Sequence, residues 1–188
     1  MPKRFPPEFK RDVVRVVRRG DLTIAEVAAD FDVSPESVRR WMHQADIDDG
    51  VRDGLTTAEQ QTQLSLWAMA RSPLIIGANL TLLDQDTLRL LCNTDILKID
   101  QTATASRQVL HQGDLVIWTA DLPGNQRALA AFNLGEKAIA FDRPLSDFFP
   151  AGPYDIKNAW TGARSPAGVG LSATLEPHAS VVLMLDKK

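Results

Sequence analysis

The stretch DGVRDGLTTAEQQTQLSLWAMARSPLIIG, residues 49–77, marks a change of character along this chain. Up to about residue 60 the sequence contains short helical runs separated by turn signals. It then continues as a longer helical run, QQTQLSLWAMARS, and as PLIIG, a short continuous apolar run that is typical of a buried parallel strand. Two segments with different folds are therefore predicted to meet within this stretch.

The composition is that of a globular protein without membrane segments. The chain has 188 residues, of which 44% are hydrophobic and 24% are charged, enough for one ordinary domain or two small ones. No apolar run approaches the roughly 20 residues that cross a bilayer, and no apolar stretch follows the charges of MPKRFPPEFKRD. We therefore expect no membrane partner and a cytoplasmic location. Cys92 is a single cysteine, which leaves no intrachain disulfide and favours a small core residue.

The first 50 residues carry signals for three helices. Pro6 and Pro7 suit a helix start, and Gly20 ends the apolar pattern that follows them. TIAE, residues 23–26, is a capping box for a second helix. SPES, residues 34–37, supplies a serine N-cap and a first-turn proline for a third. Two short capped helices joined by about three or four residues predict a helix-turn-helix.

The third predicted helix has the side chains of a DNA reader. Val38, Trp41 and Met42 would lock it against the second helix, and the opposite side would face a major groove. Arginine can fork onto guanine, glutamine onto adenine, glutamate onto cytosine, and serine onto phosphate or base. The candidate DNA-binding residues are Glu36, Ser37, Arg39, Arg40, His43 and Gln44.

The charge distribution agrees with a nucleic-acid partner. Residues 1–19 contain seven basic and two acidic side chains, although the whole chain has a net charge of −3. The first helix could therefore add salt-sensitive phosphate contacts. The alternative is a helical hairpin whose polar face is merely solvated. His43 has no second ligand at a suitable spacing, so no metal site is predicted.

A family resemblance supports DNA binding. The segment KRFPPEFKRDVVRVVRRGDLTIAEVAADFDVSPESVRRWMHQADIDDG resembles the N-terminal helix-turn-helix of insertion-sequence transposases, over about residues 2–60. The resemblance implies double-stranded DNA as a partner. In that family a leucine-zipper helix and a catalytic domain with three metal-binding acids follow, and neither follows here. Strand transfer and a metal cofactor are therefore not implied, and no cofactor is expected.

The rest of the chain predicts helices and then strands. The helical run that contains Leu64, Trp67 and Ala68 would turn these side chains inward, and DQDTLRLLCN would do the same with Leu88 and Leu91. From Gln108 onward, seven short strands alternate with Gly- and Pro-containing turns, including TGARSPAG. Closely spaced strands of this kind predict a small antiparallel sandwich.

This part resembles the end of a sugar-cleaving enzyme. EQQTQLSLWAMARSPLIIGANLTLLDQDTLRLLCNTDILKIDQ is similar to the end of the barrel of glycoside hydrolase family 27, the α-galactosidases. GDLVIWTADLPGNQRALAAFNLGE and EPHASVVLML are similar to the β-sandwich that closes those enzymes. Asn79 departs from the family, in which many members have Asp there. The expected fold class is α+β, with a helix-turn-helix over residues 1–50, a junction over 51–61, a barrel-end remnant of the last helix and strand of a (β/α)₈ barrel over 62–107, and an antiparallel β-sandwich over 108–188.

The catalytic residues implied by this family are not among the residues retained. A retaining glycosidase needs two carboxylates about 5 to 5.5 Å apart, which stand at the ends of different strands of a barrel of roughly 250 residues. The family carries this pair near the middle of the barrel, so we name no catalytic residue and expect an inactive protein. Helix capping or a solvated position is expected for Asp84, Asp86, Asp95 and Asp100, a structural role for His111 and His178, and a core position for Trp67, Trp118 and Trp160, although these tryptophans could stack on a sugar.

These observations lead to a hypothesis about origin and to three candidate functions. Both resemblances meet in DGLTTAEQ, residues 53–60, so we interpret the chain as the start of one gene joined in frame to the end of another. DNA binding is the favoured function. An α-galactosidase-related hydrolase and a non-catalytic carbohydrate-binding sandwich are the alternatives. Self-association is a further prediction, because a barrel strand over residues 72–80 would present unpaired edges.

Overall fold

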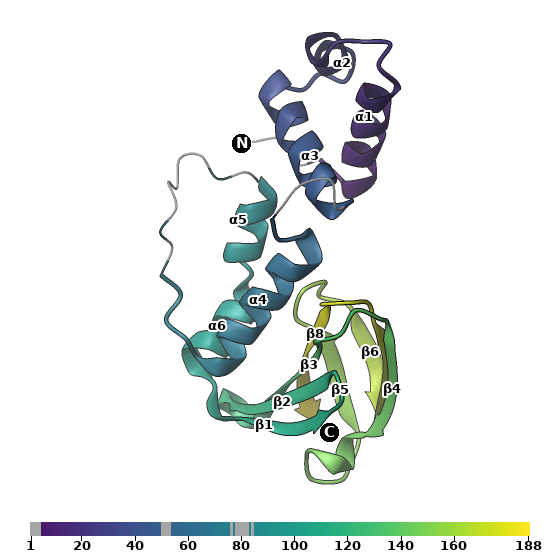
Figure 1. Cartoon of the computed structure of the whole chain (residues 1–188). Helices are drawn as coiled ribbons and strands as arrows, with labels where there is room; N and C mark the ends of the chain where they lie inside the picture. Colours follow the sequence, from purple (N-terminus) through teal and green to yellow (C-terminus); the bar gives the residue numbers. More distant parts are fainter. Residues whose placement is uncertain (1–4, 50–53, 76, 78–82, 84) are drawn as a thin grey trace. The chain divides into compact units, whose positions relative to one another are not determined.

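The computed structural model describes residues 5–49, 54–75, 77, 83 and 85–188. The chain divides into two compact units, Met1–Thr57 and Ala58–Lys188. The first unit is helical, and the second combines helices with antiparallel strands (Figure 1). The α+β fold class predicted from the sequence is therefore confirmed.

Three helices form the first unit, as predicted. They are α1 (Pro7–Arg19), α2 (Ile24–Asp30) and α3 (Pro35–Asp48). Their core is a small cluster of buried aliphatic side chains, Val13, Val27, Ala28 and Val38. The ring of Phe9 extends this core, since its centroid lies 5.7 Å from that of Phe31 and 6.1 Å from that of Trp41, both in edge-on geometry.

The helix boundaries follow from the predicted caps. The Glu26 amide donates to Thr23 Oγ1 at 3.3 Å, and the Thr23 amide donates to Glu26 Oε2 at 2.8 Å, which completes the capping box. The hydrogen bond from the Thr23 amide, followed by that from its hydroxyl, lowers the pKa of Glu26. The Ser37 amide donates to Ser34 Oγ at 3.1 Å. Gly20 ends α1 in the left-handed region, at a φ of 80°, where its amide donates to the Val17 carbonyl.

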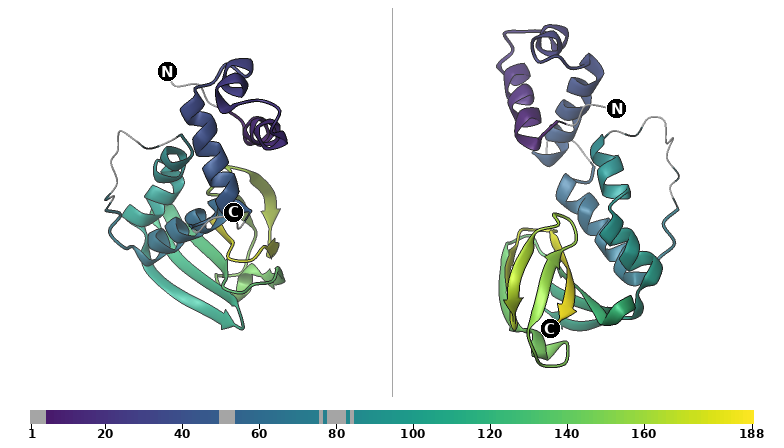
Figure 2. Two further views of the ribbon diagram at one scale, coloured as in Figure 1. Left: turned by 45° about the horizontal axis from the view of Figure 1, so that its top comes forward. Right: turned by 180° about the vertical axis from the view of Figure 1, so that it is seen from behind.

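Helices and two sheets form the second unit. Its helices are α4 (Thr57–Ala70, which starts one residue before the unit), α5 (Gln85–Leu91) and α6 (Thr94–Thr102). One sheet has the strand order β1-β2-β3-β8-β5-β6 and the other pairs β4 with β7, all antiparallel. Figure 2 shows the helices and strands of this unit from two further sides. The strands are β1 (Thr104–Gln112), β2 (Leu115–Leu122), β3 (Gln126–Asn133), β4 (Ile139–Pro144), β5 (Tyr154–Asn158), β6 (Arg164–Gly168), β7 (Gly170–Leu175) and β8 (Ser180–Lys187).

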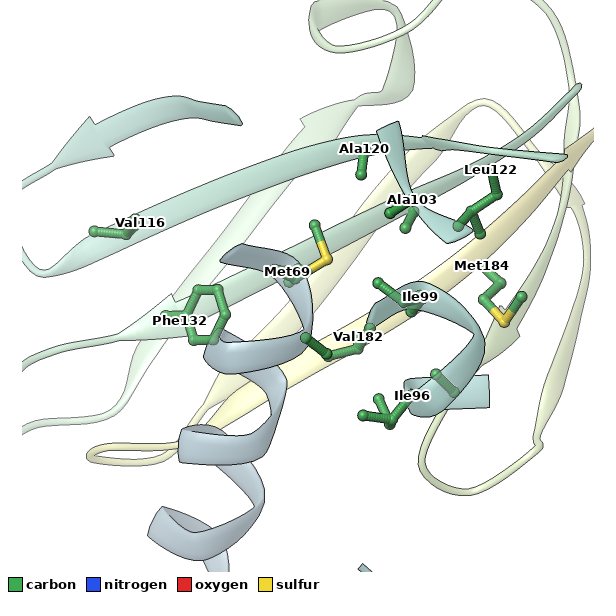
Figure 3. Close-up of a cluster of buried hydrophobic side chains, with 14 residues drawn as sticks. Met69, Ile96, Ile99, Ala103, Val116, Ala120, Leu122, Phe132, Val182 and Met184 are labelled. Atoms are coloured by element: carbon green, nitrogen blue, oxygen red, sulfur yellow. The ribbon is translucent and has the colours of Figure 1, made fainter. Parts of the chain in front are cut away.

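The central strands of the large sheet are buried on both faces. Because side chains alternate along a strand, Leu115 and Ile117 of β2 join the core between the two sheets, whereas Val116 and Ala120 join a second core. In this second core, Met69 of α4 and Ile96 and Ile99 of α6 face the sheet (Figure 3). The helices predicted as a remnant and the sandwich therefore form one packed unit of three layers.

The prediction of a strand over PLIIG is wrong for those residues of the segment that the structure describes. Residues 72–75 and 77 lie in neither a helix nor a strand, and the other residues of the expected strand, 76 and 78–80, lie outside the described part. The side chain of Ile75 is 85% exposed. A parallel strand needs neighbours that bury both of its faces, and such neighbours are absent around the described residues of this segment. The described residues of this segment form no strand, so they give no support to self-association through unpaired strand edges.

Three further predictions about burial or element type were wrong. Leu64 and Ala68 are buried as expected, but Trp67 is 41% exposed, and Ser65 and Met69 are buried on α4 instead. Cys92 is exposed, so it is not a core residue. TGARSPAG was predicted as a turn, but it contains β6, whose proline is tolerated because β6 is an edge strand. Leu88 and Leu91 of α5 are only partly buried.

Candidate nucleic-acid interface

One side of α3 is polar and exposed, and the other packs against the first unit's core. With 3.6 residues per turn, positions 36, 40 and 43 share one face of the helix and position 39 lies beside it. Glu36, Arg39, Arg40 and His43 are all exposed. On the opposite side Val38 is completely buried, and Trp41 and Met42 pack against the core. We call the four exposed residues the α3 polar face.

Ser37 and Gln44, the other two candidate residues, are partly buried and bonded within the unit. Ser37 contributes its amide to the Ser34 cap, and the two hydroxyl oxygens lie 2.9 Å apart. Gln44 Nε2 donates to Asp48 Oδ1 at 2.9 Å and to the Leu55 carbonyl at 3.5 Å. The amide of Gln44 therefore faces the segment that leaves α3. The geometry favours the α3 polar face over these two residues as contacts for a ligand.

The α3 polar face contains a small ion-pair network. Glu36 Oε2 lies 3.5 Å from Arg39 Nη1, and Glu36 Oε1 lies 3.8 Å from Arg40 Nε. The side chains of the three residues are between 42% and 60% exposed. Exposed ion pairs of this kind contribute about 0–1 kcal/mol, so both guanidinium groups can leave Glu36 for a stronger anion.

The basic residues of α1 are less available for phosphate contacts than the sequence suggests. Arg18 donates hydrogen bonds to Asp49 at 2.6 Å and to Asp46 at 3.0 Å, and these bonds, the one to Asp49 first, raise the pKa of its guanidinium. Arg18 therefore joins α1 to the C-terminal end of α3. Arg11 and Arg15 pair with acids one turn away on α1, and Lys3 and Arg4 lie outside the described residues.

The described acids of α5 and α6 form ion pairs or lie at partly buried positions. Asp86 pairs with Arg89 at 3.0 Å. Asp95 Oδ2 lies 2.5 Å from Lys157 Nζ and thereby joins α6 to β5. Burial raises the pKa of Asp100, an effect that Arg71 partly offsets. Asp84 lies outside the described residues, and within the described part no group of three or more His, Cys, Asp or Glu residues could hold a metal ion.

His178 is the centre of a contact that the sequence did not predict. Its Nδ1 lies 2.9 Å from Glu59 Oε1 of α4, and its Nε2 lies 3.2 Å from Glu136 Oε1 in the turn after β3. The bond to Glu59 is the largest cause of the raised pKa of His178. The three residues are far apart in sequence and carry no motif, so only the fold reveals the cluster. Its position between a helix and two turns fits the structural role that we expected for His178.

Trp67, Trp118 and Trp160 are the tryptophans that could stack on a sugar, and two of them have structural roles within the second unit. The indole N–H of Trp160 donates to Ser65 Oγ at 2.8 Å, and that hydroxyl donates to the Gln61 carbonyl at 2.7 Å. Trp118 and Trp160 both pack against the core beneath α4 and α6, as expected. Both rings are only partly buried. Trp67 is the one of the three that the structure leaves substantially exposed.

An open pocket of about 350 Å³ lies between the end of β1 and β4. Its polar groups include Gln112 and Arg143, which are hydrogen-bonded to each other at 2.6 Å. Asp142 is the single carboxylate in its lining. This pocket does not offer the paired carboxylates that a retaining glycosidase requires.

Comparison with known families accounts for both units. A transposase family model matches residues 1–70, and the model of the α-galactosidase C-terminal β-sandwich domain matches residues 112–185. Two different family models thus match the two parts of the chain. Met1–Thr57 is therefore called the transposase-like unit, and Ala58–Lys188 the galactosidase-like unit.

The similar proteins extend the second match toward α4. An α-galactosidase of Coffea arabica is 28% identical over 137 residues, which are 70% of this chain and 36% of that protein. Alpha-galactosidase 2 of Arabidopsis thaliana is 29% identical over 141 residues, 72% of this chain and 35% of that protein. Both alignments are longer than the sandwich match, so they include residues before β1.

A solved structure gives the same result. A GH27 β-L-arabinopyranosidase from Geobacillus stearothermophilus is 32% identical, with a TM-score of 0.68, over 70% of this chain and 31% of that one. The chain spans about one third of the length of the relatives that it matches. In the part of the chain that the structure describes, no helix is long and apolar enough to span a membrane.

Proposed function

We propose that this chain binds double-stranded DNA through α3 and carries the galactosidase-like unit as a folded part without hydrolytic activity. The observation that carries the proposal is the α3 polar face. It lies opposite the buried side of α3, and Ser34 caps the N-terminus of this helix. The transposase family match over residues 1–70 supports it. A cytoplasmic location would fit this function.

The proposed contacts follow from the chemistry of the four side chains. The N-terminal half of α3 enters the major groove, as the recognition helix of a helix-turn-helix does. Arg39 and Arg40 can each donate two hydrogen bonds to O6 and N7 of guanine. His43 lies one turn further along the same face and can donate to a base or a phosphate. Ser37 and Gln44 remain secondary candidates, because the structure bonds them within the unit.

Replacement of Arg40 by alanine tests this proposal. We expect the affinity for a duplex selected from a random library to fall about 10- to 100-fold, since one bidentate guanine contact contributes about 1–3 kcal/mol. Fluorescence anisotropy at several salt concentrations measures the loss. Arg89→Ala is the matched control, because it removes from α5 an exposed arginine that also pairs with an acid one turn away. Wild-type protein that binds no duplex, or equal affinities of Arg40→Ala and wild type, would contradict the proposal.

The absence of hydrolysis is the second part of the proposal. The described acids of α5 and α6 form ion pairs or are absent from the lining of the pocket beside β4, and Glu59 and Glu136 face His178. We expect no release of nitrophenol from an aryl α-galactoside or an aryl β-L-arabinopyranoside above the rate with heat-denatured protein. Turnover that scales with native protein and co-purifies with it through size-exclusion chromatography would refute this expectation.

Carbohydrate is a weaker candidate partner. Trp118 and Trp160 are partly buried and pack against the core, so their positions favour a structural role over sugar stacking. Trp67 is exposed on α4 and is the ring that a sugar could reach.

A further inference from the structure

We propose that Glu36 restrains Arg39 and Arg40 and thereby limits the affinity of this chain for DNA of the wrong sequence. The inference rests on the proposed function of α3 and adds a specificity-determining residue to it. Glu36 lies in the first turn of α3, and its two carboxylate oxygens approach one guanidinium group each, at 3.5 and 3.8 Å. One anion is thus shared between two cations on the α3 polar face.

A carboxylate at this position opposes phosphate binding. Non-specific association depends on basic side chains that neutralise phosphates and release counterions. Glu36 competes with the phosphates for both arginines, and the phosphates repel the negative charge of its carboxylate. A duplex of arbitrary sequence can offer the arginines little besides this phosphate attraction. Glu36 therefore weakens non-specific binding.

At a DNA site with correctly placed guanines, the carboxylate of Glu36 opposes binding only weakly. An exposed ion pair stabilises only weakly, whereas a bidentate contact between arginine and guanine discriminates strongly against a wrong base. The arginines can therefore exchange Glu36 for a correctly placed guanine, and this exchange remains favourable. The penalty from Glu36 falls mainly on sequences that lack the guanines. It follows that Glu36 acts through the arginines as a positioning residue.

This role differs from a direct contact between Glu36 and cytosine, the alternative suggested by the sequence. A base contact would make Glu36→Gln weaken binding at the preferred site and would leave the salt dependence on other DNA unchanged. If Glu36 instead restrains the arginines, the Glu36→Gln variant should bind other DNA more tightly and with a steeper salt dependence. The two roles are thus separated by the salt dependence of non-specific binding.

The experiment measures the affinity of the full chain for a random-sequence 25-base-pair duplex between about 50 and 200 mM NaCl. In Glu36→Gln we expect roughly three- to tenfold tighter binding at the lowest salt concentration and a log–log salt slope steeper by about 0.9, the value for one additional phosphate contact. Glu36→Asp keeps the charge and is expected to stay within about twofold of wild type. Asp86→Asn is the matched control, because it neutralises a carboxylate that pairs with Arg89 on α5.

The outcomes separate this inference from the proposed function. Wild-type protein without salt-dependent binding to any duplex would overturn the DNA-binding function itself. Wild-type binding together with an unchanged or weaker Glu36→Gln variant of normal helical content would overturn the restraint by Glu36 alone. An equal gain in Asp86→Asn would also overturn it, because net charge would then explain the effect.

Discussion

Replacement of Ile99 by alanine is expected to lower the free energy of unfolding of the galactosidase-like unit by about 2–5 kcal/mol. Ile99 of α6 is completely buried in the core that α4 and α6 share with the large sheet. The same cluster contains Met69 of α4 and Val182 of β8 (Figure 3). The substitution leaves a cavity that a close-packed interior fills only in part.

Denaturant titration followed by near-ultraviolet circular dichroism measures this loss, because tryptophans pack against the same core. Ile75→Ala is the matched control: Ile75 is 85% exposed, and its truncation is expected to change the stability by less than about 0.5 kcal/mol. If the two variants were equally stable, α6 would not be part of the folded unit. That result would restore the view of residues 62–107 as a loosely attached remnant.

This packing explains which features of the second unit could be predicted from the sequence. The alternation of apolar side chains predicts most strands of the sheet, and Ala128 and Ala130 of β3 are small enough to let helices approach. The sequence does not say that this second face is covered by α4 and α6. The amphipathic pattern of α4 is weak, so Trp67 was expected inside although it is exposed, while Ser65 is buried because it bonds to Trp160.

The helix after the predicted barrel strand shows the same limit. DTLRLLCNTDILKIDQ resembles one helix of the hydrolase family, yet the chain forms α5 and α6 with a break at Asn93. The Asn93 side chain accepts hydrogen bonds from the amides of Asp95 and Ile96, each at 3.0 Å, and so starts a new helix. Asparagine in the middle of a helical pattern can either continue the helix or start a new one. Only the packing of Ile96 and Ile99 decides between these two possibilities.

The candidate interface was predicted more completely than the galactosidase-like unit, because its signals are local. Caps at Thr23 and Ser34 and the spacing of Val38, Trp41 and Met42 fix which side of α3 is exposed. Contacts between distant residues were not predictable. Examples are the hydrogen bonds of Arg18 to Asp46 and Asp49, which remove one expected phosphate ligand from α1.

Replacement of Val38 by aspartate is expected to unfold the transposase-like unit and to abolish DNA binding, while the galactosidase-like unit keeps its thermal transition. Val38 is completely buried, and among the described residues it shares a cluster of four buried aliphatic side chains. An unpaired charge in such a core costs several kcal/mol, which exceeds the small stability available to a unit of this size. Calorimetry of the full chain, with the DNA-binding assay alongside, measures both effects.

Ala25→Asp provides the control, because it introduces the same charge at an exposed position in the first turn of α2, where the helix dipole favours it. This variant is expected to keep its helical signal. Loss of the galactosidase-like transition together with the helices of the other unit would show that the two units fold as one. Such coupling would contradict the division of the chain after Thr57 into two separately folded units.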